Sequence, residues 1–183
     1  MKKVFAIAAS ILGFAVAANA QTAASASASQ TTKLSLTDAV EIIFTGSGTN
    51  TGGLVTLPFT TVDNYTNGVE SGAQDLRVRS NKNFSVTVNA NAANFTYSGT
   101  TTPAPAMPVS GVLNLMVSAN GTGGTTASAF TGYSSLTSSV QNLITAGTRG
   151  GNQTFSVKYK GTPGFSYPAG DYSVNVVYTV TQQ

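Results

Sequence analysis

The side chains that most often carry out chemistry in proteins are scarce in this chain. It contains no histidine, no cysteine and only six carboxylates among 183 residues. The commonest general bases, thiol nucleophiles and transition-metal ligands are therefore excluded. Catalysis by paired carboxylates needs both groups to face one cleft, but Asp38 and Glu41 would point to opposite faces of a strand. We therefore expect a protein that is not an enzyme, with no catalytic residues, no metal site and no cofactor.

The segment DNYTNG, from Asp63 to Gly68, comes nearest to a cation-binding motif. A calcium loop would have an oxygen ligand at its third position and a bidentate glutamate at its twelfth. Here those positions are Tyr65 and Gln74. The segment is more typical of a tight Asn-Gly turn between two strands, and we interpret it in that way.

An export signal begins the chain. Two lysines precede the apolar run VFAIAASILGFAVAA, and ANA at residues 18–20 is typical of a cleavage site. The apolar run is short for a bilayer span. Residues 1–20 are thus predicted to be a secretory signal peptide, and the mature chain is not expected to span a membrane. We expect export to the periplasm, the cell surface or the extracellular space.

The mature chain would be nearly neutral. All six acidic residues and seven of the nine basic residues lie after residue 20. The basic residues of the runs near Arg77 and Lys158 alternate with apolar residues, as on a solvated strand face. We therefore expect no nucleic-acid partner.

Residues 21–32, QTAASASASQTT, contain no large apolar side chain and are predicted to form a flexible leader. Alanine and serine alternate there, so the leader could become extended against a partner. From Lys33 the pattern becomes apolar and alternating, which predicts one long strand or two pieces bent at Asp38. A short helix capped by Asp38, with Glu41 at its third position, is the alternative. In the strand interpretation, the apolar side chains that share one face are Leu34, Leu36, Val40, Ile42 and Phe44.

Further alternating runs continue to the end of the chain, separated by segments rich in glycine, proline and asparagine. One segment differs, because SSLTSSVQNLITAG has apolar residues at helical spacing, and it predicts one short helix near 135–146. The whole pattern favours an all-β fold: an immunoglobulin-like antiparallel β-sandwich of about seven to nine strands over residues 33–183. The remaining runs begin near Leu54, Leu76, Phe84, Leu113, Phe155 and Tyr172.

The closing segment YPAGDYSVNVVYTVTQQ is the clearest strand in the sequence. It resembles the C-terminal strand of secreted pilin-type domains, such as spore coat protein U-like and chaperone-usher fimbrial subunits. Gln182 stands where those subunits usually have tyrosine. The matching residues are Ala169, Gly170, Tyr172, Val174, Val176, Tyr178 and Val180.

The resemblance implies a structural subunit of a bacterial surface filament or coat, with a role in adhesion. It implies self-association into a polymer, and a periplasmic chaperone and outer-membrane assembly machinery as partners. One strand of each sandwich would come from a neighbouring subunit. The donor would be Leu34 and Leu36, together with Val40, Ile42 and Phe44. The same residues could instead complete the sandwich of their own chain, and the sequence leaves both readings open.

A second function remains open. A monomeric secreted module of the same fold could bind a carbohydrate or another surface through exposed aromatic rings. The candidates are Tyr65, Tyr97, Tyr133 and Tyr167.

Overall fold

The computed structural model describes residues 25–46 and 52–183. The expected signal peptide, residues 1–20, and the first residues of the leader lie outside the described residues. Residues 25–35 are exposed and have no regular secondary structure. Residues 36–183 form one compact unit.

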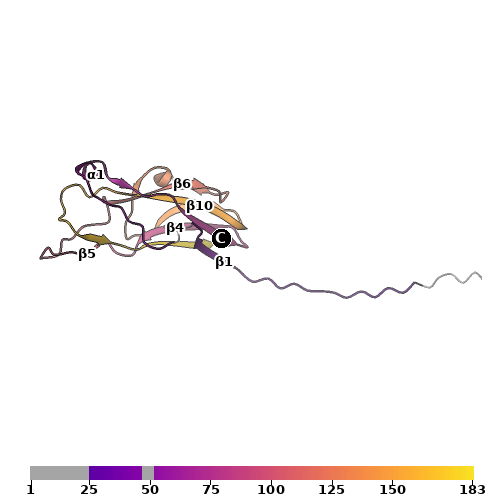
Figure 1. Cartoon of the computed structure of the whole chain (residues 1–183). Coiled ribbons are helices and arrows are strands. Elements are labelled where there is room, and N and C mark those ends of the chain that lie inside the picture. Colours follow the sequence, from indigo (N-terminus) through magenta and orange to yellow (C-terminus); the bar gives the residue numbers. More distant parts are fainter. Residues whose placement is uncertain (1–24, 47–51) are drawn as a thin grey trace, which may run out of the picture. The chain divides into compact units, whose positions relative to one another are not determined.

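This unit is built from two antiparallel sheets (Figure 1). The first contains, in spatial order, β1 (Val40–Phe44), β3 (Gln74–Ser80), β10 (Gly150–Gly161), β6 (Leu113–Asn120) and β8 (Ser134–Ser135), and β2 (Val69–Glu70) pairs with the end of β10. The second contains β12 (Val176–Gln182), β4 (Phe84–Ala90), β9 (Gln141–Gly147) and β7 (Thr125–Thr126). A separate ribbon pairs β5 (Thr96–Ser98) with β11 (Asp171–Ser173). The helical elements of the described residues are α1 (Val62–Asn67) and a 3-10 turn at Ser128–Thr131.

The core lies between the two sheets, because alternate residues of each strand point inward. The inward residues of β4, for example, are completely buried, whereas the intervening residues are partly exposed. The predicted all-β sandwich is confirmed. Its largest fully buried side chains are Phe84, Phe130, Phe155, Leu76, Leu115, Leu136, Leu143 and Ile144.

The helix predicted near 135–146 is wrong, because this segment contains β8 and β9. The pairing of β9 with β4 shifts register on both sides of Ile144. Such a bulge adds a residue to one strand, so the adjacent residues Leu143 and Ile144 are both buried. Val140, which a helix would bury with them, is 69% exposed. The apolar residues that are spaced as in a helix therefore belong to a bulged strand.

The strand predicted from Lys33 begins only at Val40, and the alternative helix capped by Asp38 is also wrong. Val55, Leu57 and Phe59 alternate inward as expected, but residues 54–59 belong to no described ladder. Leu57 and Phe59 lie over Gly161, where an added Cβ would come within 3.2 Å of each. This extended segment thus covers the core by side-chain packing alone.

The turn expected at residues 63–68 is instead α1. Thr61 and Asn64 form a reciprocal capping box at its start, in which each side chain accepts a hydrogen bond from the backbone N–H of the other. Gly68, with φ of 79°, ends the helix in a conformation that favours glycine. The local hydrogen bonds of Asn64 therefore stabilise a short helix at the position where a tight Asn-Gly turn was expected.

Candidate assembly edge

Within the described residues, β12 is an edge strand with no strand paired to one side of its backbone. Just beyond its two ends, Asn91 N–H donates to Asn175 O at 2.9 Å and Gln183 N–H donates to Asn83 O at 2.8 Å. Hydrogen-bonded pairs alternate along an antiparallel ladder, so the odd-numbered residues of β12 bond to β4. The even-numbered residues direct their N–H and C=O groups away from β4. No strand or hydrogen bond in the described residues engages these groups.

The same edge leaves part of the core accessible. The inward side chains of β4 are completely buried, because β4 has a strand on each side. Their counterparts on β12, which has one neighbouring strand, pack against the core but stay partly exposed. A strand added beside β12 would therefore bury apolar surface as well as satisfy backbone groups. The residues concerned are Val176, Tyr178 and Val180.

β1 runs antiparallel to β12 along this side of the sandwich. The ring of Phe44 meets the ring of Tyr178 edge-on at 6.0 Å. Towards the other end of β12, the Gln182 side chain donates to Ala39 O at 2.9 Å. β1 takes all its backbone pairing from β3, with the register Val40 to Ser80. The strand region of the expected donor therefore lies in the sandwich of its own chain.

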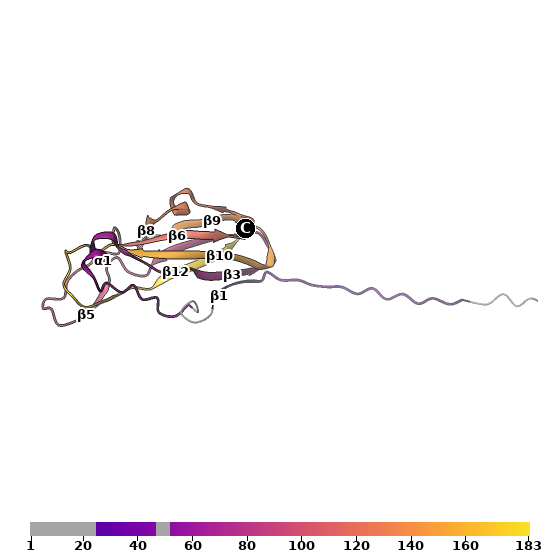
Figure 2. The ribbon, with the colours of Figure 1, turned by 45° about the horizontal axis from the view of Figure 1, so that its top comes forward.

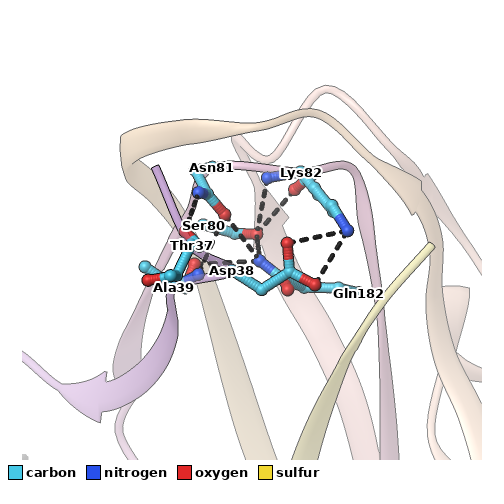
Figure 3. A network of polar contacts seen from close by, with 7 residues as sticks. All are labelled: Thr37, Asp38, Ala39, Ser80, Asn81, Lys82 and Gln182. Atoms are coloured by element: carbon cyan, nitrogen blue, oxygen red, sulfur yellow. Dashed lines mark hydrogen bonds and ion pairs between the residues drawn. The ribbon is translucent and has the colours of Figure 1, made fainter. Parts of the chain in front are cut away.

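A group of polar side chains, which we call the latch, holds the chain just before β1 (Figure 3). Asn81 accepts from Ala39 N–H at 3.0 Å and donates to Thr37 O at 2.7 Å. Gln182 donates to Asn81 Oδ1 at 3.0 Å, and Lys82 forms an ion pair with Asp38 at 2.7 Å. The latch thus ties the entry to β1 to the β3–β4 turn and to the end of β12.

The closing segment does not form one strand. Residues 171–173 pair with β5 as β11, while residues 176–182 pair with β4 as β12. Tyr172 therefore packs on Tyr97, with ring centroids 5.0 Å apart, and is not part of the main core. Val174, which lies between the two strands, does pack against the core.

Gly170 has a local structural role. Its φ is 150°, and the Tyr97 ring occupies the space that an added Cβ would need, so the position leaves no room for a side chain. The Tyr97 hydroxyl also donates to Ala169 O at 3.0 Å. This glycine therefore allows the chain to pass over Tyr97 before β11 begins.

Leu34 and Leu36 are 85% and 88% exposed. Neither side chain belongs to the core of the described residues. Large apolar side chains so exposed in a segment without secondary structure are suited to burial against a partner. The two residues are separated by one position, so they would share one face of an added strand.

The four expected ligand-binding tyrosines do not all gather at one site, although Tyr97 and Tyr167 both pack against Tyr172. The hydroxyls of Tyr97 and Tyr172 donate hydrogen bonds to backbone carbonyls. The ammonium group of Lys160 lies 5.7 Å from the centre of the Tyr133 ring. Tyr65 stacks on Phe165, whereas Tyr167 meets Tyr172 edge-on.

Two features are absent from residues 25–46 and 52–183. No three His, Cys, Asp or Glu side chains in this part of the chain are placed to hold a metal ion. None of its helices is long and apolar enough to cross a membrane.

Comparison with known proteins assigns the chain to no family. No protein-family model matches the chain, and no curated protein matches it as a relative.

Proposed function

We propose that this protein is an exported, pilin-like structural subunit of a bacterial surface filament or coat. Its subunits would assemble when the leader of one copy adds as a strand to β12 of another. Adhesion would follow from the assembled structure, and a periplasmic chaperone would protect β12 until assembly. The observation that carries the proposal is the side of β12 that has no neighbouring strand in residues 25–46 and 52–183, together with its half-buried apolar side chains.

The energetics favour addition of a strand at this edge. Each backbone hydrogen bond contributes about 0.5–1.5 kcal/mol net, and a fully buried leucine contributes about 1.5–3 kcal/mol. Leu34 and Leu36, which are almost fully exposed, would supply the apolar burial. The donor in this proposal is limited to residues before Thr37, because Val40, Ile42 and Phe44 already belong to β1.

The length of the leader and the direction in which the chain enters β1 favour a donor strand from another copy. Residues 21–36 can span about 50 Å when extended, whereas the seven residues of β12 span about 24 Å. Because β1 runs antiparallel to β12, residues 37–39, which lead into β1, lie beside Gln182 at the end of β12. A leader that paired with β12 of its own chain would have to reverse at the latch, where Thr37 and Ala39 are held.

The decisive experiment separates donor from acceptor. A subunit lacking residues 21–36 is mixed with a synthetic peptide of those residues, and binding is measured by calorimetry. We expect a soluble folded monomer that binds the peptide and no longer polymerises. A leaderless subunit that still forms native polymers would contradict the proposal.

Two peptides provide matched controls. In the first, Leu34→Asp and Leu36→Asp place charges on the inward face and should abolish binding. In the second, Lys33→Gln and Ser35→Thr change the opposite face and should bind as the unmodified peptide does. Equal binding of both peptides would show that the leucines are not inserted.

The alternative function, a monomeric carbohydrate-binding module, rests on one observation. Phe165 is 67% exposed and stacks on Tyr65, an arrangement that could present an aromatic face to a sugar ring. Glycan binding by a strictly monomeric protein, lost on Phe165→Ser, would favour this function over assembly.

A further inference from the structure

An apolar patch lies at one end of the sandwich and is built around α1. Phe59, Tyr65 and Phe165 form a row of rings, with both neighbouring centroid distances 5.4 Å. Phe165 is 67% exposed, and Val62 of α1 is 71% exposed. We call these four residues the aromatic cap.

The aromatic cap lies at the end opposite the latch. Gly68, which ends α1, packs against Gly161 at the end of β10. The start of β10, Gly150, pairs instead with Ser80, beside the latch. Figures 1 and 2 show α1 and β5 together at one end, and the C-terminus at the other. We call these the cap end and the latch end.

The direction of an added strand decides which ends meet. A leader that runs antiparallel to β12 enters beside Gln182 and leaves beside Val176, towards the cap end. The domain that follows this leader would then place its latch end against the cap end. Unlike ends do not close on themselves, so the contact repeats along a filament. A parallel leader would bring two latch ends together and would close a dimer.

Exposed charged side chains that have no ion-pair partner in the described residues differ in sign between the two ends. Asp63 of α1 and Asp171 of β11 are exposed at the cap end, and neither forms an ion pair within the described residues. At the latch end, Arg149 is exposed and has no carboxylate partner in the same part of the chain. Opposite charges on unlike ends favour contact between cap end and latch end and disfavour contact between like ends.

We propose that the aromatic cap is a second subunit interface, which receives the latch end of the next copy of this chain. This inference rests on the proposed assembly through β12 and adds the surface against which successive domains stack. Burial of Val62 and Phe165 would set the angle between successive subunits, whereas strand addition would link them.

The first test compares substitutions of apolar residues of similar exposure. Val62→Thr with Phe165→Ser should slow polymerisation of the full-length chain by about tenfold or more, the effect of losing about 1.4 kcal/mol. Binding of the leader peptide to β12 should be unchanged. Val140, which is outside both β12 and the aromatic cap, is 69% exposed, so Val140→Thr is the control and should polymerise normally. Normal polymerisation of the Val62 and Phe165 variant would overturn the proposal.

The second test uses the absence of cysteine from the chain. A full-length variant with Val62→Cys and Gln183→Cys is polymerised and treated with a short bismaleimide crosslinker. We expect a ladder of crosslinked species beyond the dimer. Crosslinked dimers from the Gln183→Cys single variant would show that latch ends meet each other and would overturn the proposal.

The two proposals fail in different ways. If the leader peptide does not bind to β12, strand addition is wrong whatever the cap variants do. If the peptide binds but cap variants assemble normally and lose glycan binding, the aromatic cap is a ligand site and not an interface.

Discussion

The hydroxyl oxygens of Tyr159 and Tyr178 lie 2.8 Å apart and join β10 of the first sheet to β12 of the second. Tyr159 is 7% exposed, and its ring belongs to the main core. Burial raises the pKa of Tyr159 to about 12. Burial first, and then the neighbouring Tyr159, raise the pKa of Tyr178 well above its usual value. This pair thus ties the open edge strand to the centre of the opposite sheet.

Removal of one hydroxyl should leave the other buried without this partner. We expect Tyr159→Phe and Tyr178→Phe each to lower the free energy of unfolding by about 1–3 kcal/mol. The double variant should lose less than the sum, because it leaves no unpaired hydroxyl. Urea denaturation of the three variants measures this coupling, and strictly additive losses would contradict it.

The same tyrosines should make the fold sensitive to alkali. In the unfolded chain tyrosine ionises near pH 10, whereas Tyr159 keeps its proton to about pH 12 in the folded state. Between these values the unfolded state binds fewer protons, so stability falls as pH rises. The slope reaches about 1.4 kcal/mol per pH unit for each such group. Denaturation from pH 8 to 12 should show this fall, and Tyr159→Phe should reduce its slope.

Gly170 should matter for local stability even where no assembly occurs. A side chain at this position meets the Tyr97 ring, and φ is 150°. We expect Gly170→Ala to destabilise the monomer by about 1–3 kcal/mol. Gly151→Ala, where an added Cβ meets nothing within 4 Å, is the matched control and should have little effect. Equal melting temperatures for both variants would refute the local role of Gly170.

The latch should protect the entry to β1 from opening. Asn81→Ala removes the acceptor for Ala39 N–H and the donor to Thr37 O. We expect faster hydrogen exchange at Ala39, by about tenfold for each 1.4 kcal/mol of local stability lost. Gln183→Ala, whose side chain makes no hydrogen bond in the described part of the chain, should leave this exchange rate unchanged.

The bulged strand β9 gives a direct test of the corrected secondary structure. Leu143 is completely buried, so Leu143→Ala should cost about 2–5 kcal/mol. Val140 is 69% exposed, so Val140→Ala should cost less than about 0.5 kcal/mol. Similar losses at both positions would instead support the helix that the sequence pattern predicted.

The sequence pattern predicted most of the strands and much of the core. Period-two alternation identified β3, β4, β6, β10 and β12, because each has one face on the core and one towards solvent. It could not locate the bulge in β9, which disturbs that period. It also could not divide the closing segment between β11 and β12, because side-chain alternation continues through residues 174 and 175, where the pairing partner changes.

The sequence by itself indicated the fold class, since many short runs of alternating apolar residues can bury their apolar faces when two sheets pack together. The sequence also excluded catalysis or metal binding through histidine or cysteine side chains, because the chain contains neither residue. Only the tertiary structure decided that Val40–Phe44 pairs with β3 and that one side of β12 has no strand in the described residues. Strand neighbours depend on contacts between distant residues, such as Gln182 with Ala39. No local pattern specifies such contacts.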